Sequence, residues 1–106
     1  MRFLMKVSLP VEKANAAAKD GSLAKTIQSI VTELNPEAAY FATDGQGRRS
    51  GYLFFDMQKP SQIPAVAEPW FLAFNAAVEI VPAMKPEDLS KAETDIKKAA
   101  KKYGGR

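Results

Sequence analysis

The sequence contains neither cysteine nor histidine among its 106 residues. Without cysteine, the chain can form no disulfide bond, thiolate nucleophile or thiolate metal site. Without histidine, it lacks the most common general base and the most common metal ligand. Any chemistry must therefore come from Asp, Glu, Lys, Arg, Tyr or Ser, or from a cofactor. We expect no cofactor, and we expect no metal site because the carboxylates show no clustering that would suit magnesium or calcium.

Long apolar segments are also absent. No run approaches the ~20 apolar residues that a transmembrane helix needs, so we expect no membrane partner. The first six residues resemble the start of a signal peptide, but the apolar stretch is too short, and Lys6 and Pro10 interrupt it. We therefore expect a cytoplasmic location.

The residues that are present predict one globular domain spanning 1–106, with an ordinary hydrophobic content of 46%. Residues Arg2–Leu9 alternate in polarity, which predicts a strand. Apolar residues then recur at three- and four-residue spacing through Val11–Leu34, which predicts an amphipathic helix. Gly21 is the position where this helix is least stable, since glycine in a helix interior lowers helix stability by ~1 kcal/mol relative to alanine. Either the helix continues through it, or Ser22 caps a second segment.

Three further strands are expected. Ala38–Thr43 and Ser50–Met57 flank the glycine-containing turn 44–49, and together they predict a hairpin. The last strand is expected at Ala76–Met84, where apolar side chains alternate in direction.

Two more helices are expected in the second half of the chain. Ser61 is suited to cap the first of them, and Pro69 predicts a break or a kink within it. Pro86 opens the last helix, whose acidic start and basic end suit the helix dipole. Its apolar stripe comprises Leu89, Ala92, Ile96, Ala99 and Tyr103.

This order predicts an α+β chain with the ferredoxin-like pattern βαββαβ, followed by an extra C-terminal helix. Helices should cover one face of a four-stranded antiparallel sheet. The more apolar set should face these helices: Phe3, Met5, Val7, Leu9, Leu53, Phe55, Met57, Val78 and Ile80. The other face should hold Leu4, Lys6, Ser8, Tyr40, Tyr52, Phe54, Asp56, Glu79 and Val81.

That second face has too much aromatic surface for a monomer, because large exposed apolar patches usually mark interfaces. We therefore predict a homodimer through the sheet face, which would enclose a space of mixed polarity between two copies. The C-terminal helix could pack on its own subunit or clasp the partner.

Three segments, Pro36–Phe41, Gly51–Leu53 and Ala67–Phe71, together with this pattern resemble an uncharacterised bacterial family of the dimeric α/β-barrel superfamily. That superfamily includes muconolactone-isomerase-like and small monooxygenase-like proteins. The resemblance implies a dimeric barrel and a cavity between or beneath the sheets. It does not select one activity, because the superfamily has several. The histidine that many haem-binding or cofactor-free monooxygenase members use is missing from this chain.

Three charged residues of the sheet face are candidates for catalysis. Glu79 could shuttle a proton, Lys6 could stabilise an enolate-like oxyanion, and Asp56 is a second carboxylate. The structural alternative is an ion pair at the interface. The candidate ligand-binding residues are Tyr40, Tyr52, Phe54 and Trp70.

Trp70, Phe71 and Phe74 could form the wall of a pocket or belong to the core. Arg48 and Arg49 could bind an anion or be solvated turn residues. Neither pair of alternatives is decided by the sequence.

The last ten residues include five basic ones, which could bind the phosphates of a nucleic acid. Exposed aromatic side chains on the sheet could stack on its bases. The sequence pattern of RNA-recognition domains is absent, and Lys6 is the only basic residue that we place on the sheet face. We therefore expect no nucleic-acid partner.

The leading hypothesis is a protein that binds an unidentified small molecule in a cavity at the sheet face. It could act as a cofactor-independent isomerase or oxygenase-like enzyme; the alternative is a non-catalytic interaction module.

Overall fold

Four antiparallel strands form one sheet in the order β2–β3–β1–β4. The computed structural model describes residues 1–105. The strands are β1 (Arg2–Ser8), β2 (Ala38–Thr43), β3 (Arg49–Asp56) and β4 (Ala77–Pro82). Each lies within two residues of its predicted bounds.

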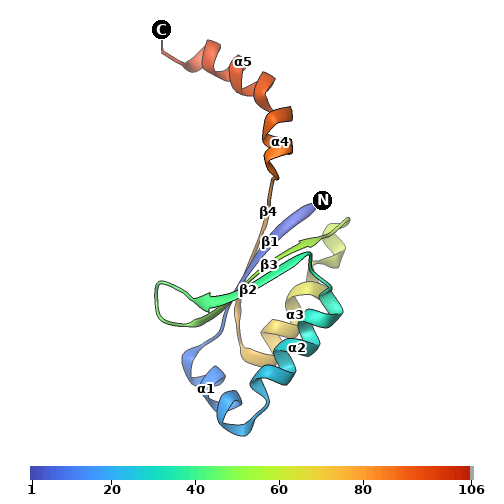
Figure 1. The fold of residues 1–106 in the computed structure, drawn as a ribbon, viewed down its shortest axis with the longest axis vertical. Coiled ribbons are helices and arrows are strands. Elements are labelled where there is room, and N and C mark those ends of the chain that lie inside the picture. The colour runs from blue at the N-terminus through green and yellow to red at the C-terminus, as the bar shows by residue number, and fades with distance from the viewer. Residues whose placement is uncertain (106) are drawn as a thin grey trace.

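Three helices cover one face of this sheet (Figure 1): α1 (Val11–Asp20), α2 (Leu23–Leu34) and α3 (Ile63–Phe74). A short 3-10 turn, η1 (Pro60–Gln62), precedes α3. Two more helices, α4 (Pro86–Lys91) and α5 (Glu93–Tyr103), follow β4. The order of the elements and the sheet topology confirm the predicted α+β, ferredoxin-like fold.

The core lies between the sheet and the covering helices. Met5, Val7 and Leu53 are 0% exposed, and Phe55 is 1% exposed. Alternation along the strands places them all on the helix-facing side, where each fully buried side chain contributes ~1.5–3 kcal/mol. The whole predicted inward set belongs to this core or packs against it.

Gly21 divides the predicted first helix in two. Its φ is 85°, a left-handed conformation that glycine adopts without the clash that a Cβ would cause. Its backbone N–H donates to the carbonyl of Ala18, which ends α1. Ser22 occupies the N-cap position of α2, but its hydroxyl makes no capping bond; its backbone N–H donates to Asp20 Oδ1 at 2.8 Å.

Of the two outcomes predicted at Pro69, a break or a kink, the break is wrong, because α3 continues through this residue. Proline has no N–H, so the carbonyl of Ala65 loses its usual helical donor. Ala65 is exposed, and water can bond to that carbonyl. Beyond the proline, Trp70 and Phe74 are 1% and 2% exposed, and their packing holds this part of the helix in place.

Helix α3 also begins one residue later than predicted, with Gln62 instead of Ser61 in the N-cap position. The side-chain Oε1 of Gln62 accepts the backbone N–H groups of Gln58 and Lys59 at 2.8 and 2.9 Å. These bonds fold the preceding segment into η1, so that Pro64 falls in the first turn of the helix.

The two C-terminal helices, α4 and α5, form an arm that projects away from the rest of the chain (Figure 1). We predicted one helix here, but it is interrupted at Ala92. The radius of gyration is 17.7 Å, against about 13 Å for a compact chain of this length. The apolar stripe of the arm remains in water, with Leu89, Ile96 and Tyr103 at 52%, 51% and 75% exposure.

Candidate functional site

A cavity of about 710 Å³ lies between α2 and the β2 edge of the sheet. Ligand pockets typically measure ~300–1,000 Å³. Its apolar lining comes from Leu9, Leu23, Ile27, Val31, Phe41 and Trp70. The cavity is on the helix-covered side of the sheet, whereas we expected one at the opposite face. A cavity at that opposite face would need a second copy and stays a prediction.

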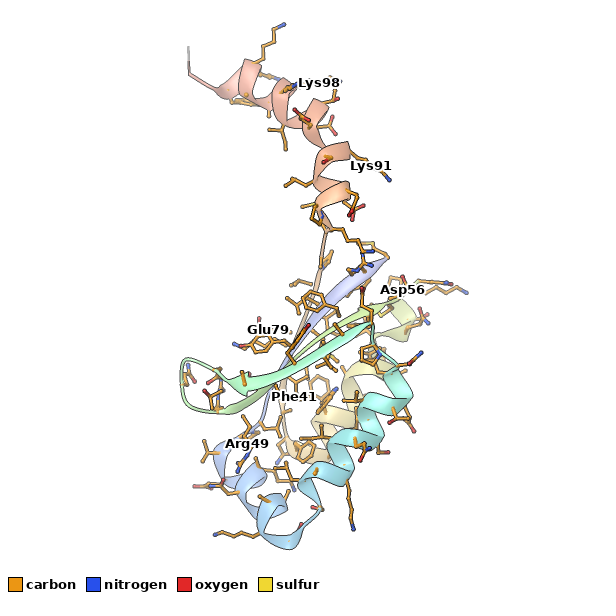
Figure 2. The ribbon with its side chains drawn as sticks, viewed as in Figure 1. Phe41, Arg49, Asp56, Glu79, Lys91 and Lys98 are labelled. Atoms are coloured by element: carbon orange, nitrogen blue, oxygen red, sulfur yellow. The ribbon has the colours of Figure 1, made fainter. Side chains whose placement is uncertain are left out.

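Gly51 lines the cavity and makes room for the ring of Phe41, which forms part of its wall. It is buried in β3, opposite Phe41 of β2 and Val7 of β1. A Cβ added at Gly51 would stand only 2.9 Å from Phe41 Cε1 and 3.3 Å from Leu53 Cδ1. The Phe41 ring therefore lies where a side chain at position 51 would clash, on the helix side of the sheet (Figure 2).

Arg49 brings a positive charge to the cavity lining. It lies on the same side of β3 as Gly51, two residues away, and is exposed. Its Nη1 donates a hydrogen bond to Asn15 Oδ1 of α1 at 2.8 Å. Within residues 1–105, the other N–H groups of this guanidinium have no protein acceptor, so they can bind a ligand.

Trp70 brings an unpaired donor to the same lining. The residue is 1% exposed, and its Nε1 is buried with no hydrogen-bond partner in the described part of the chain. Leaving a buried donor unsatisfied typically costs ~1–3 kcal/mol. Such groups are rare in folded proteins and call for an explanation.

Asp44 fixes the turn that leads into β3. Its Oδ1 accepts the backbone N–H groups of Gln46 and Arg48 at 2.8 and 3.0 Å, and its Oδ2 accepts Arg48 Nε at 2.9 Å. The hydrogen bond from the Arg48 backbone is the largest cause that lowers the pKa of Asp44 to about 2. Arg48 is engaged by Asp44, whereas Arg49 lines the cavity.

The uncovered face of the sheet, which we call the open face, carries the other predicted residues. One row crosses all four strands, in the order Tyr40, Tyr52, Lys6 and Glu79. The next row contains Ala38, Phe54, Leu4 and Val81. Figure 2 shows Glu79 on the side of the sheet opposite to the helices.

The open face is accessible in the single chain. Tyr40 is 66% exposed and Val81 is 49% exposed, while Lys6, Tyr52 and Phe54 are half-buried. Lys6 and Glu79 stand directly opposite each other in the register of β1 and β4. Side chains in such pairs have Cβ atoms ~4.5–5.5 Å apart, so the two charges can meet.

Two of the seven predicted site residues lie outside these two rows of the open face. Asp56 is at the end of β3, where Oδ1 is 2.7 Å from the Met1 amino group, and the pair is exposed. Trp70 is on the helix side, where it belongs to the core and also lines the cavity. The structure thus brings five of the seven together and leaves their chemical roles as predictions.

Phe41 and Gly51 were missed as site residues by the sequence reasoning, and Arg49 was considered only as an anion-binding alternative. One signal was available for Gly51. A glycine inside an otherwise aromatic-rich strand often marks a close approach of another group or a ligand. Phe41 gave no such signal, because its role depends on a partner ten residues away.

Neither a metal centre nor a membrane span is seen in residues 1–105. No three Asp or Glu side chains there come together as a possible metal site. Of the helices in that range, none has both the length and the apolar character needed to cross a bilayer.

No protein-family model matches the sequence, and no curated protein matches it. The fold is similar to 5-chloro-2-hydroxyhydroquinone dehydrochlorinase from Burkholderia phenoliruptrix AC1100, solved in complex with 2,5-dihydroxybenzoquinone. The TM-score is 0.60 over 83% of this chain and 98% of the other, at 13% identity. A formyltetrahydrofolate deformylase from Pseudomonas putida KT2440 gives 0.48 at 16% identity, over 78% of this chain and 29% of that one. The first similarity shows a shared ferredoxin-like fold.

Proposed function

We propose that this protein binds a small, largely apolar organic molecule in the cavity between α2 and β2. The observation that carries the proposal is the cavity itself, with its volume of about 710 Å³ and its wall of aliphatic and aromatic side chains. A ligand ring of phenyl size buries ~150 Å², which at ~25 cal/mol per Å² yields about 4 kcal/mol. That corresponds to a dissociation constant in the millimolar range from apolar contact alone.

The similar dehydrochlorinase supports a ligand of this size. Its structure contains 2,5-dihydroxybenzoquinone, a small cyclic organic molecule. A related fold can therefore accommodate a ligand of that class, although this chain shares only 13% of its residues. The identity of the ligand has to be derived from the residues of this chain.

Tryptophan fluorescence tests the proposal, because Trp70 is the only tryptophan in the chain and lines the cavity. Phenylbutanol is a suitable probe, since it is apolar, uncharged and does not absorb where tryptophan is excited. We expect saturable change of the emission with phenylbutanol concentration. A linear change, or none up to the solubility limit, would overturn the proposal.

We also propose that the protein is a homodimer through the open face, acting in the cytoplasm. The aromatic and aliphatic side chains of this face support pairing, because exposed apolar patches of this kind mark interfaces. The edge strands β2 and β4 run in opposite directions at opposite sides of the sheet. A two-fold axis along the strands would bring β4 of one copy antiparallel to β2 of the other, which would satisfy both edges.

The arm supports the same assembly. It leaves the body from β4, the edge strand that would meet the second copy, and its apolar stripe remains exposed. Of the two placements considered from the sequence, packing on its own subunit is absent from this structure. Clasping a second copy would remove Leu89, Ile96 and Tyr103 from water.

Proton-transfer catalysis at the open face is a second candidate function, favoured by the register pairing of Lys6 with Glu79. In a dimer these groups would face an enclosed space together with Tyr52. Glu79 would move a proton, and Lys6 would stabilise the oxyanion that forms, as in an isomerase or an oxygenase-like enzyme. The alternative remains an interfacial ion pair in a non-catalytic module.

Glu79→Gln separates these two roles once turnover of a substrate has been found. Loss of turnover with retained binding would support proton transfer by Glu79. Unchanged turnover would exclude this role and leave the interfacial ion pair.

A further inference from the structure

Two polar groups distinguish the cavity lining from an ordinary apolar hollow. Arg49 offers a cation with uncommitted N–H groups, and Trp70 offers a buried indole N–H without an acceptor. The two come from β3 and α3, so they approach the cavity from different elements. Both are donors. A hydrocarbon or a protonated amine has no acceptor and would satisfy neither of them.

The surroundings of Arg49 leave its charge available. Its hydrogen-bond partner, Asn15, is a neutral amide, and none of the ion pairs within residues 1–105 includes Arg49. The neighbouring Arg48 is paired with Asp44 instead. An arginine prefers an acid because its planar guanidinium can donate two parallel hydrogen bonds to a carboxylate.

We infer that the cavity takes a hydrophobic organic acid, whose anionic group binds Arg49 and whose apolar body fills the space under Phe41 and Gly51, with an oxygen of the ligand accepting the Trp70 indole N–H. This inference rests on the proposed small-molecule function and adds the chemical class of the ligand. Apolar contact alone gives millimolar affinity and is the same for any ligand with this apolar body. The selectivity for an acid must therefore come from the two hydrogen-bond donors.

Three probes with the same apolar body test the class of ligand. Phenylbutyrate, phenylbutanol and phenylbutylamine share a phenyl ring on a short alkyl chain and carry an anionic, a neutral and a cationic head group, respectively. We expect phenylbutyrate to bind about tenfold or more tightly than the other two in calorimetric titrations, which corresponds to about 1.4 kcal/mol. Equal affinity for all three would overturn the acid preference while leaving the small-molecule proposal intact. Binding of none of them would overturn both.

Three variants test whether Arg49 causes the preference for phenylbutyrate over the other two probes. Arg49→Gln should reduce the advantage of phenylbutyrate to about twofold or less, because the charge-assisted hydrogen bonds are lost. Lys19→Gln, the same charge change at an exposed residue of α1, should leave the advantage unchanged. Asn15→Ala removes the bond between α1 and Arg49 but keeps the cation, so the preference should persist. A preference that survives Arg49→Gln would contradict the inference.

The indole N–H of Trp70 gives one unambiguous signal in a ¹H–¹⁵N NMR spectrum, because the chain has a single tryptophan. Phenylbutyrate should move this proton signal to higher frequency, as a new hydrogen bond does. Phenylbutylamine should leave it close to its free position. No shift of the indole signal at saturation with phenylbutyrate would rule out the contact with Trp70.

Discussion

The Phe41 ring lies over Gly51, with its Cε1 2.9 Å from the point that a Cβ at position 51 would occupy. The two residues are direct partners in the register of β2 and β3. Because β3 has no side chain at this position, the Phe41 ring can lie against the backbone of β3. Phe41 also forms part of the wall of the cavity between α2 and β2.

Filling this cavity should abolish binding. Gly51→Val introduces a β-branched side chain that displaces the Phe41 ring towards the cavity, and such overpacking typically costs ~1–3 kcal/mol of stability. We expect the affinity for phenylbutanol to fall about tenfold or more, measured by Trp70 fluorescence. Gly45→Val is the control, because a Cβ there meets no atom within 4 Å. If the Gly51→Val variant binds phenylbutanol as tightly as the unchanged protein, the ligand does not bind in the cavity between α2 and β2.

A charge placed in the open face should prevent dimer formation. Phe54 lies in the second row of the open face, between Ala38 and Leu4, and Phe54→Glu would bury a carboxylate with no cation directly opposite it at the interface. Light scattering coupled to gel filtration should then report 11.6 kDa instead of twice that mass. Leu72→Glu changes an even more exposed apolar residue, 78% accessible on α3, and should leave the dimer intact. A dimer that persists in the Phe54→Glu variant is not formed through the open face.

The arm should contribute to the dimer but not to the stability of the body. The double variant Leu89→Asp/Ile96→Asp makes the apolar stripe polar, so we expect the dimer dissociation constant to rise about tenfold or more. At concentrations where the protein is monomeric, Tm should not change, because the arm projects away from the body. Ser90→Asp/Thr94→Asp places the same charges at polar positions of the arm and is the control. A large drop in the monomer Tm of the first variant would show that the arm packs on its own subunit.

Asp44 should make stability depend on pH in the acid range. The pKa of Asp44 is about 2 in the folded protein, below its ordinary value of 3.8. The ionised carboxylate therefore contributes its full stabilisation above about pH 3.8, and this stabilisation is lost as the pH falls towards 2. Asp44→Asn should therefore lower Tm at neutral pH, and the gap from the unchanged protein should narrow between about pH 4 and pH 2. Thermal melts followed by circular dichroism measure this gap. Asp95→Asn in the exposed arm should produce no gap, and a gap for Asp44→Asn that does not depend on pH would contradict the role of the carboxylate.

The strands were predictable from the sequence because each follows a local pattern. Alternation fixed which side chains of β1 and β3 face the helices, and the ferredoxin-like order then placed Lys6 opposite Glu79. The break at Pro69 was wrong because local propensity was overridden by packing, with Trp70 buried on the far side of the proline. The interruption at Ala92 lacks a local signal, since alanine favours a continuous helix.

The cavity was not predictable from the same patterns. It depends on the missing side chain at Gly51, on the Phe41 ring from another strand and on helix α2. A periodic pattern of apolar residues predicts each element separately but does not predict how these three come together in space. Arg49 was visible in the sequence but ambiguous, because nothing local distinguishes it from Arg48. The turn around Asp44 engages Arg48, and only the folded structure shows this.

Native mass spectrometry in the presence of phenylbutyrate tests the central claim, that the α2–β2 cavity is a small-molecule site. We expect a species of twice 11.6 kDa that carries up to one phenylbutyrate for each chain, with occupancy that rises and saturates as the ligand is added. Gly51→Val should give a species of the same size that carries none. A protein that carries no phenylbutyrate at any concentration, or a Gly51→Val variant that carries as much as the unchanged chain, would contradict the account.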